Sequence, residues 1–221
     1  MTKDIGSGKS SDTHSLIRFD RVERAVHWSL ACLFIILIAT ALPLYFPGVE
    51  AIFGRRLLLA DIHTWTGVAL PVPLVISLFG GWGKGLRSDI DRFNLWTRDE
   101  VRWLKSLARD PMVELGKFNP GQKLNALFTG SVIVVMFVTG IILKWFNFFP
   151  LSWRTGATFV HDTFATLFVL FLAGHVFMAV THREALRSMF TGRIPRSWAE
   201  RHAPIWLREA DRNGQDTSRR S

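Results

Sequence analysis

The sequence predicts an all-α membrane protein, in which four transmembrane helices form a bundle and both chain termini lie in the cytoplasm. Its 221 residues are 48% hydrophobic, and the apolar residues are concentrated in four blocks instead of being spread along the chain. Each block supplies the roughly 20 residues that one helix needs to cross a bilayer. A β-barrel would instead show alternating segments of about ten residues. We therefore expect membrane-spanning helices at about Ala25–Phe46, Leu57–Trp82, Leu124–Phe146 and Thr158–Val180.

The positive charge lies mostly on one side of these helices. Of 27 lysines and arginines, five precede the first helix, nine lie in the connection 84–123, and nine follow from Arg183 onward. The two other connections hold the remaining four. Because basic residues concentrate on the cytoplasmic side of a membrane protein, this distribution predicts a bacterial inner-membrane protein with its N- and C-termini inside.

The net charge of +9 would suggest a nucleic-acid partner if the protein were soluble. Here anionic membrane lipid is the expected partner of these charges, and nucleic acid is not. Residues 1–20 hold no apolar core, so a cleaved signal peptide is not expected. The single cysteine, Cys32, excludes a disulfide framework and a four-thiolate iron–sulfur cluster within this sequence. Any redox role must therefore use another cofactor.

Composition divides the chain into three parts. Residues 1–17 are rich in Ser, Asp, Lys and Gly and are expected to form a flexible cytoplasmic tail. Residues 18–200 hold the four-helix domain, and residues 201–221 form a cytoplasmic C-terminal tail. The cytoplasmic connection 84–123 is too long to be a bare loop, so we expect it to contain structure of its own.

One stretch of that connection predicts a surface helix. Thr97 and Glu100 have the spacing of a capping box, and Pro111 follows the expected end of the helix. Apolar residues recur on one side of it, namely Val101, Leu104 and Leu107. Trp96 and Trp103 suit the lipid interface. The same pattern would fit a helix packed against a partner subunit, and the sequence does not choose between the two.

Four of the seven histidines lie within or near the apolar blocks, namely His27, His63, His161 and His175. Ionisable residues inside a membrane are uncommon and usually functional. His161 and His175 are fourteen residues apart, which is about 40° short of four full helical turns. They therefore share one face of the fourth helix, about 21 Å apart along its axis.

The depth of each histidine in the membrane groups the four into two pairs. At the outer edge, His161 lies seven residues inside Arg154 and His63 lies eight residues inside Arg55. His27 and His175 lie six and eight residues inside the inner edge. Two imidazoles at one depth on different helices can bind a haem iron from opposite sides. The depths therefore predict two b haems, with an outer pair His63/His161 and an inner pair His27/His175.

Haem propionates are anionic and need cationic partners near the membrane surfaces. Four arginines are well placed for this role, namely Arg24, Arg55, Arg56 and Arg154. The competing interpretation is that the four histidines are satisfied polar residues, or a proton relay in a haem-free transporter. That alternative predicts a colourless protein, and it explains the matched depths less well.

Four stretches of the chain carry a resemblance to a known family. They are RVERAVHW at 21–28, DIHTWTG at 61–67, KFNPGQKLN at 117–125 and HDTFATLFVLFLAGH at 161–175. Together they resemble the cytochrome b (gamma) subunit of membrane-bound respiratory formate dehydrogenase, over about residues 18–200. The first stretch is shared with other bacterial di-haem b cytochromes, and the KFNPGQK stretch is the more specific mark.

The resemblance implies a complex with two other kinds of subunit. A molybdenum- or tungsten-containing catalytic (alpha) subunit oxidises formate, and an Fe–S (beta) subunit carries the electrons to the membrane. In the family the outer haem takes ligands that match His63 and His161, and the inner haem takes those that match His27 and His175. A quinone, menaquinone or ubiquinone, is then reduced near the cytoplasmic face. The resemblance also allows three complexes to assemble as a trimer of heterotrimers.

The resemblance places the quinone beside the inner haem, which makes Asn119, Gly121 and Gln122 candidate quinone-binding residues. Asn and Gln amides and a backbone N–H can donate hydrogen bonds to quinone carbonyls. The same residues also form an ordinary helix start, with Asn119 as N-cap, Pro120 at the first helical position and Gln122 completing a capping box. Both roles are compatible.

Two other assignments within the haem proteins remain open at this point. The chain could be the cytochrome b subunit of a nickel–iron hydrogenase or a thiosulfate reductase, whose helices would look nearly the same. It could also be a stand-alone di-haem cytochrome b acting on quinol or superoxide. That second assignment predicts full activity from the isolated chain and leaves the long cytoplasmic connection unexplained.

Overall fold

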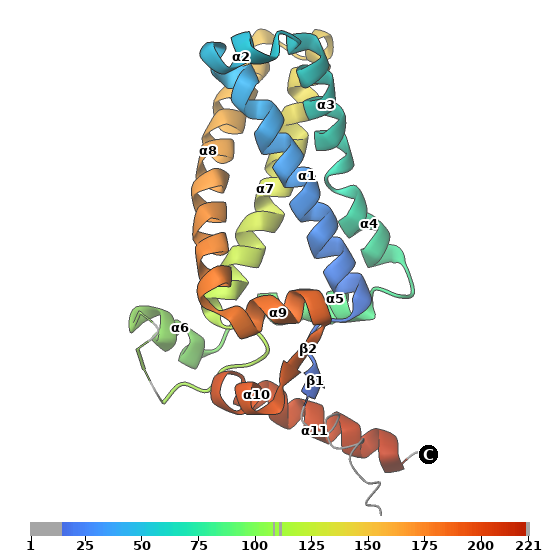
Figure 1. Cartoon of the computed structure of the whole chain (residues 1–221), viewed down its shortest axis with the longest axis vertical. Coiled ribbons are helices and arrows are strands. Elements are labelled where there is room, and N and C mark those ends of the chain that lie inside the picture. Colours follow the sequence, from blue (N-terminus) through green and yellow to red (C-terminus); the bar gives the residue numbers. More distant parts are fainter. Residues whose placement is uncertain (1–14, 108, 111, 220–221) are drawn as a thin grey trace, which may run out of the picture.

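A computed structural model describes residues 15–107, 109–110 and 112–219, and the side chains of all of these except residues 52, 53 and 214–219. Four long helical segments stand side by side as an upright bundle, and shorter helices lie beneath one end of it (Figure 1). In chain order the elements are β1 (Ser15–Ile17), α1 (Arg21–Tyr45), α2 (Pro47–Phe53), α3 (Arg56–Ala69), α4 (Val72–Phe79), α5 (Lys84–Asn94), α6 (Arg98–Lys105), α7 (Pro120–Lys144), η2 (Phe146–Phe148), α8 (Leu151–Thr181), α9 (Arg183–Thr191), β2 (Arg193–Pro195), α10 (Arg196–His202) and α11 (Pro204–Arg219).

The four predicted spans are confirmed as helices long and apolar enough to cross a membrane. They are α1, the pair α3–α4, α7 and α8. All four spans begin before the expected residue, at Arg21, Arg56, Pro120 and Leu151, because each helix starts outside its most apolar block. The first turn of α1 is closed by a capping box, in which the backbone N–H of Glu23 donates to Asp20 Oδ1 at 2.8 Å.

The second span is interrupted where the sequence places two prolines. Helix α3 ends at Ala69 and α4 begins at Val72, with Leu70 and Pro71 between them. Proline has no backbone N–H and its ring clashes with the preceding turn, so it breaks a helix in this way. Leu70 is only 2% exposed, so the break faces the core of the bundle.

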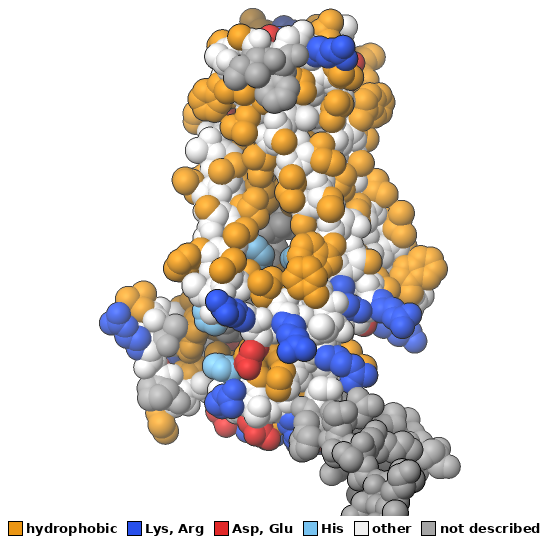
Figure 2. Space-filling model, viewed as in Figure 1, with side chains coloured by type: hydrophobic (Ala, Val, Ile, Leu, Met, Phe, Trp, Pro, Cys, Tyr) orange, Lys and Arg blue, Asp and Glu red, His pale blue; other side chains and the backbone are white. Residues whose placement is uncertain are grey.

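The core of the bundle is small and draws on all four spans. Its buried members are Phe34, Leu70, Val132, Ile133 and Phe168. Many other large apolar side chains are exposed, and on the face shown in Figure 2 they form a band over the upright part of the molecule. Side chains of this kind can be stable on the outside of a helix bundle when lipid covers them. The Lys and Arg side chains visible in Figure 2 gather mainly below this band.

The connection between α4 and α7 contains two helices. Helix α5 crosses the end of the bundle (Figure 1), and the sequence analysis did not foresee it. The predicted surface helix is present as α6, and the expected capping box is confirmed by the bond from the Glu100 N–H to Thr97 Oγ1 at 3.2 Å. Its predicted extent was wrong at one end. The helix stops at Lys105, and Leu107, with a φ of 54°, lies outside it.

A second core joins the two ends of the described chain below the bundle. Strand β1 pairs antiparallel with β2, with Leu16 opposite Ile194. Helices α10 and α11 pack beside this two-stranded sheet, and the buried members of the cluster are Ile194, Ala199, Ala203, Trp206 and Leu207. The expected tail boundaries therefore cut through ordered elements, because residues 15–17 form β1 and residues 201–202 complete α10. The rest of the expected N-terminal tail, residues 1–14, lies outside the described residues.

Candidate functional site

The structure brings together the two histidine pairs that the membrane depths predict. His63 on α3 and His161 on α8 have ring centroids 6.4 Å apart, with their planes inclined at 63°. His27 on α1 and His175 on α8 have centroids 6.3 Å apart, with an angle of 45°. The two pairs lie toward opposite ends of the bundle, because fourteen residues of α8 separate His161 from His175. The bundle thus presents two similar sites, one above the other.

The spacing within each pair fits a single metal ion between the rings. Metal–imidazole bonds of about 2 Å on opposite sides of one ion place the ring centroids about 6 Å apart. In the described parts of the chain, no group of three or more His, Cys, Asp or Glu residues could hold a metal ion. Each pair could therefore supply two ligands to one ion and would leave its remaining coordination positions to other donors. A porphyrin supplies those positions itself, so haem fits this donor set.

Two buried hydroxyl groups accompany the outer pair. His63 Nδ1 lies 3.0 Å from Thr40 Oγ1 on α1, and His161 Nδ1 lies 2.8 Å from Thr139 Oγ1 on α7. Both threonines are 7% exposed. The sequence analysis missed them, because each lies more than twenty residues from its histidine and on a different helix. Their contacts leave the Nε2 atom of each ring available to a metal ion.

The inner pair has different surroundings. His27 Nδ1 is buried and has no hydrogen-bond partner among the described residues. The edge of Trp28 packs against the His27 ring at a centroid distance of 5.1 Å. Trp28 is held in turn by α9, since its Nε1–H donates to the carbonyl of Met189 at 3.1 Å and its ring lies 4.6 Å from Phe190. The inner site is therefore bordered by apolar and aromatic groups.

An aromatic pair lies between the two histidine sites. Phe168 is seven residues from both His161 and His175 on α8, and Phe34 is seven residues after His27 on α1. Their ring centroids are 4.2 Å apart, and both side chains are buried. The position of Phe168 could have been inferred from the sequence, because its seven-residue spacing places it on the same face of α8 as the two histidines. The contact of Phe34 with the Phe168 ring is seen only in the structure.

The four arginines expected near haem propionates have different environments. Arg24 donates to the backbone carbonyls of Asp20 and Phe190, so its guanidinium links α1 to α9. Arg55 is exposed. Arg56 is also exposed and pairs with Glu50 at 2.7 Å.

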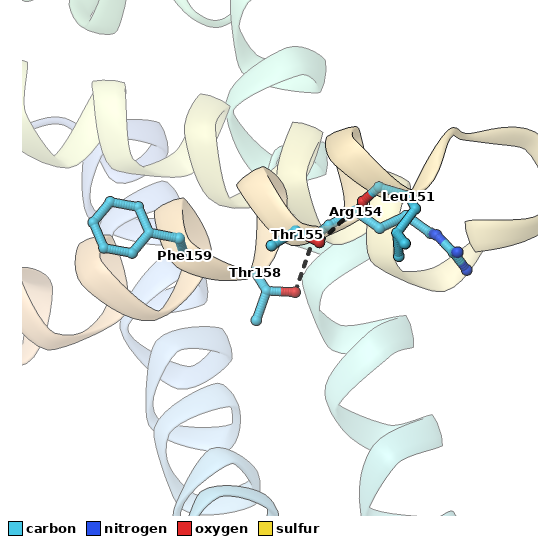
Figure 3. Close-up of a pocket in the computed structure, with 5 residues that line it drawn as sticks. All are labelled: Leu151, Arg154, Thr155, Thr158 and Phe159. Atoms are coloured by element: carbon cyan, nitrogen blue, oxygen red, sulfur yellow. Dashed lines mark hydrogen bonds between the residues drawn. The ribbon is translucent and has the colours of Figure 1, made fainter.

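Arg154 differs from the other three arginines because one of its side-chain nitrogens, Nε, is buried without a hydrogen-bond partner among the described residues. It lines a hollow of about 520 Å³ on α8, together with Leu151, Thr155, Thr158 and Phe159 (Figure 3). The role of all four arginines toward propionates stays a prediction.

The candidate quinone residues form the first turn of α7. The Gln122 N–H donates to Asn119 Oδ1 at 2.8 Å, and the Asn119 N–H donates to Gln122 Oε1 at 3.1 Å. Both side-chain oxygens are therefore used by the helix cap. Neither side-chain NH₂ group has a protein partner within the described residues, so both remain available as donors. A Cβ added at Gly121 would lie 3.3 Å from Asn119 Oδ1, which is closer than ordinary contact.

Two buried lysines hold this turn in place from either side. Lys117 Nζ donates to Glu23 Oε1 at 3.0 Å and to Asp89 Oδ2 at 2.6 Å, which ties the turn to α1 and α5. Lys123 Nζ lies 2.6 Å from Glu100 Oε1, which ties it to α6. All five of these side chains are less than 10% exposed. The lysines were visible in the KFNPGQK stretch, but their partners are distant in sequence and could not be found from it.

Arg18 connects this region to the second core. Its Nη2 donates to the carbonyl of Lys117 at 3.3 Å, and its guanidinium lies 4.6 Å from the Trp198 ring and 5.1 Å from the Phe19 ring. Burial lowers the pKa of Arg18 to about 10, and the nearby carboxylate of Asp89 acts in the opposite direction. Aromatic and charged contacts together therefore pack the elements below the bundle against the first turn of α7.

Comparison with known proteins finds one matching family and several similar chains. Residues 18–192 match the family described as prokaryotic cytochrome b561. The chain is 23% identical over 217 residues to the "Formate dehydrogenase, nitrate-inducible, cytochrome b556(Fdn) subunit" of Escherichia coli (strain K12), covering 91% of this chain and 94% of that one. It is 26% identical over 214 residues to the "Formate dehydrogenase, cytochrome b556(fdo) subunit" of the same strain, covering 91% and 95%.

A similar chain from another organism shows the same pattern. The "Formate dehydrogenase, cytochrome b556 subunit" of Haemophilus influenzae (strain ATCC 51907 / DSM 11121 / KW20 / Rd) is 25% identical over 212 residues, which cover 90% of this chain and 85% of that one. The family match at residues 18–192 extends over all four spans and both histidine pairs.

Proposed function

The chain belongs to the prokaryotic cytochrome b561 family, and on that premise we propose that it is the di-haem cytochrome b subunit of a respiratory formate dehydrogenase. The observation that carries this proposal is the pair of histidine sites, with centroid distances of 6.4 and 6.3 Å at two depths of one bundle. The printed names of the similar chains, which cover about 90% of this chain, support the formate dehydrogenase assignment.

His63 and His161 would hold the outer haem b, and His27 and His175 the inner one. Bound there, the haems supply one-electron carriers in series, between an Fe–S subunit on the outer side and a quinone near the cytoplasmic face. The chain's own contribution is to fix the four imidazoles at two depths and to keep water from the space between them. The packed rings of Phe34 and Phe168 serve this second purpose.

The quinone, menaquinone or ubiquinone, would bind beside the first turn of α7. The free NH₂ groups of Asn119 and Gln122 are suited to donate hydrogen bonds to its carbonyl oxygens. The backbone N–H of Gly121 belongs to the first turn of α7, where N–H groups have no partner within the helix. The buried pairs of Lys117 and Lys123 would hold these donors at a fixed position relative to the inner histidines.

The charge distribution supports an orientation with both termini in the cytoplasm of a bacterial inner membrane. The opposite end of the bundle then faces the Fe–S (beta) subunit, which receives electrons from a molybdenum- or tungsten-containing catalytic (alpha) subunit. Several large apolar side chains are exposed at this end, including Leu57 (82%), Phe148 (82%) and Trp153 (60%), and suit such a contact. Three such complexes could associate as a trimer of heterotrimers.

The direct test is substrate-dependent haem reduction in the complex purified from its native membrane without oxygen. Addition of formate should produce the reduced b-haem spectrum, and a quinone added afterwards should reverse it. Reduction by hydrogen but not by formate would instead identify a nickel–iron hydrogenase subunit. Oxidation of the haems by thiosulfate, without a response to formate, would identify a thiosulfate reductase subunit. Full quinol or superoxide activity from the isolated chain would identify a stand-alone cytochrome.

A further inference from the structure

We propose that Thr40 and Thr139 are positioning residues for the outer histidine pair, which accept a hydrogen bond from the Nδ1–H of each ring and lower the reduction potential of the outer site relative to the inner site. This inference rests on the proposed function, because it concerns the iron that His63 and His161 would bind. It goes beyond that function by assigning a role to two residues that touch neither the iron nor the substrate.

The contacts of His63 determine which of its nitrogens carries the proton. Its Nδ1 lies 3.2 Å from the carbonyl oxygen of Leu37, and a carbonyl oxygen can only accept a hydrogen bond. Nδ1 must therefore carry the proton and act as the donor. The hydroxyl of Thr40 donates its own proton to the carbonyl of Ile36 at 2.7 Å, so its oxygen is free to accept from the same Nδ1–H at 3.0 Å. Nε2 is left with a lone pair for the metal ion.

The surroundings of His161 repeat this arrangement on another helix. The hydroxyl of Thr139 donates to the carbonyl of Val135 at 2.7 Å, one helical turn earlier on α7. Because this proton is used, the Thr139 oxygen can accept from His161 Nδ1–H at 2.8 Å, in the tautomer that leaves Nε2 free. Each outer histidine on α3 or α8 is thus held by a threonine on the neighbouring helix, and each threonine is itself fixed by its own backbone.

Other threonines of the bundle show that this arrangement is not a general property of the helices. Thr158 and Thr166 on α8 make the same bond to the carbonyl four residues earlier, at 3.0 and 2.9 Å, but they are exposed and contact no histidine. Thr40 and Thr139 are buried, and both are placed at the depth of the outer rings. A hydroxyl inside an apolar bundle is costly unless it is satisfied, and here the histidine contact completes its hydrogen bonding.

The inner pair lacks this support, which gives the two sites different electronic properties. His27 Nδ1 has no partner among the described residues. A hydrogen-bond acceptor at the distal nitrogen of a ligating histidine fixes the ring orientation and raises the basicity of the ligand. A more basic ligand stabilises the oxidised iron more than the reduced iron. The outer site should therefore have the lower potential, which favours electron transfer from the outer to the inner site.

The test replaces each hydroxyl by a methyl group of nearly the same size. In Thr40→Val and Thr139→Val, the midpoint potential of the outer haem should rise, and its low-spin ferric resonance should shift or broaden as the rings lose their fixed orientation. Haem affinity at the outer site should fall by about tenfold or more, as is typical for the loss of such partners. The inner haem should keep its potential and its signal.

Two control variants make the test specific. Thr40→Ser and Thr139→Ser retain the hydroxyl and should restore the wild-type potential. Thr166→Val removes an equivalent intrahelical bond on α8 without touching a histidine and should change neither haem. The proposal is overturned if the Val variants leave the outer potential and resonance unchanged, or if Thr166→Val changes them equally.

A measurement on the unmodified protein covers the case in which a Val variant does not assemble. Redox-difference infrared spectra in H₂O and D₂O should show hydrogen-bonded Nδ1–H groups on the ligands of the lower-potential haem. Finding them only on the higher-potential haem would contradict the proposal. A wild-type protein without haem would contradict the proposed function itself, so the two failures can be told apart.

Discussion

The rings of Phe34 and Phe168 lie 4.2 Å apart, midway between the outer and inner histidine pairs. Seven residues of α8 separate Phe168 from the histidine on either side, which is about 10 Å along the helix axis. The two rings therefore occupy the part of the core that lies between the proposed haem sites. Both rings are buried, so they fill the core at this level.

Removal of the Phe168 ring should destabilise the bundle strongly. We expect Phe168→Ala to lower the free energy of unfolding by about 3–5 kcal/mol, because a buried aromatic ring is replaced by a cavity. Phe168→Leu should cost less than about 1.5 kcal/mol, since it keeps most of the volume. Chemical unfolding in detergent, followed by circular dichroism, measures both. Phe159→Ala on the same helix, where the ring is 72% exposed, should change the value by no more than about 0.5 kcal/mol. Equal losses at both positions would show that Phe168 is not a core residue.

The two roles assigned to Asn119 can be separated by one substitution. Aspartate caps a helix as well as asparagine does, because its oxygen accepts the same bond from the Gln122 N–H. It has no NH₂ group, however, and cannot donate to a quinone carbonyl. Asn119→Asp should therefore keep the haem content and stability of the wild type, while quinone reduction falls by about tenfold, as expected for the loss of one hydrogen bond worth about 1.4 kcal/mol. If Asn119→Asp reduces an added quinone analogue at the wild-type rate, Asn119 serves only as the helix cap.

The buried charge of Lys117 should matter far more than an exposed charge nearby. Lys117→Met leaves Glu23 buried without its cation and leaves Asp89 with Arg92 alone, and breaking such a buried pair typically costs about 3–5 kcal/mol. Arg102→Gln breaks contacts of an exposed arginine with Asp99 and Asp110 and should cost less than about 1 kcal/mol. The difference in thermal midpoint between these two variants tests the role of Lys117. Similar thermal midpoints for the two variants would mean that water reaches Lys117, Glu23 and Asp89 and screens their charges.

The spans and the histidine pairs could be predicted from the sequence because each depends on a local pattern. A run of about 20 apolar residues predicts a membrane helix without knowledge of its neighbours. The number of residues between a histidine and the basic residues at the membrane edge gives its depth. His63 could therefore be matched with His161 across 98 residues of sequence. The capping boxes at Thr97 and Asn119 are equally local and were found for the same reason.

The parts that the sequence did not reveal depend on contacts between distant elements. Nothing near Thr40 distinguishes it from the exposed threonines of α8, because its role follows from the packing of α1 against α3. The second core was missed for a similar reason, since Leu16 and Ile194 lie in short stretches too brief to predict a strand or its partner. Leu107 was placed on α6 by its helical spacing, but the backbone turns away after Lys105.

Acid should loosen α11 from α10 and from the segment that precedes α7. The Arg208 guanidinium donates two hydrogen bonds to Glu114 and holds the pKa of that carboxyl below its usual range, and Arg196 does the same for Asp211. A carboxyl with a lowered pKa in the folded state stabilises that state above its ordinary pKa. This contribution is lost as pH falls through the lowered value.

Hydrogen exchange measures this effect directly. Amides of α11 should exchange faster at pH 3 than at pH 6, relative to their intrinsic rates. In the double variant Arg208→Gln and Arg196→Gln, this dependence on pH should be much weaker. A variant that retains the full dependence would mean that other carboxyl groups hold α11 in place.

The central claim is that two histidine pairs each bind one b haem, and a haem count on the purified chain tests it most directly. A dithionite-reduced minus oxidised spectrum with a pyridine haemochrome assay should give two b haems per chain. Single variants His63→Ala and His161→Ala should each lose the same haem, and His27→Ala and His175→Ala should each lose the other. His202→Ala, below the bundle, should retain both. A wild-type chain that holds no haem, or variants whose losses pair differently, would contradict the account.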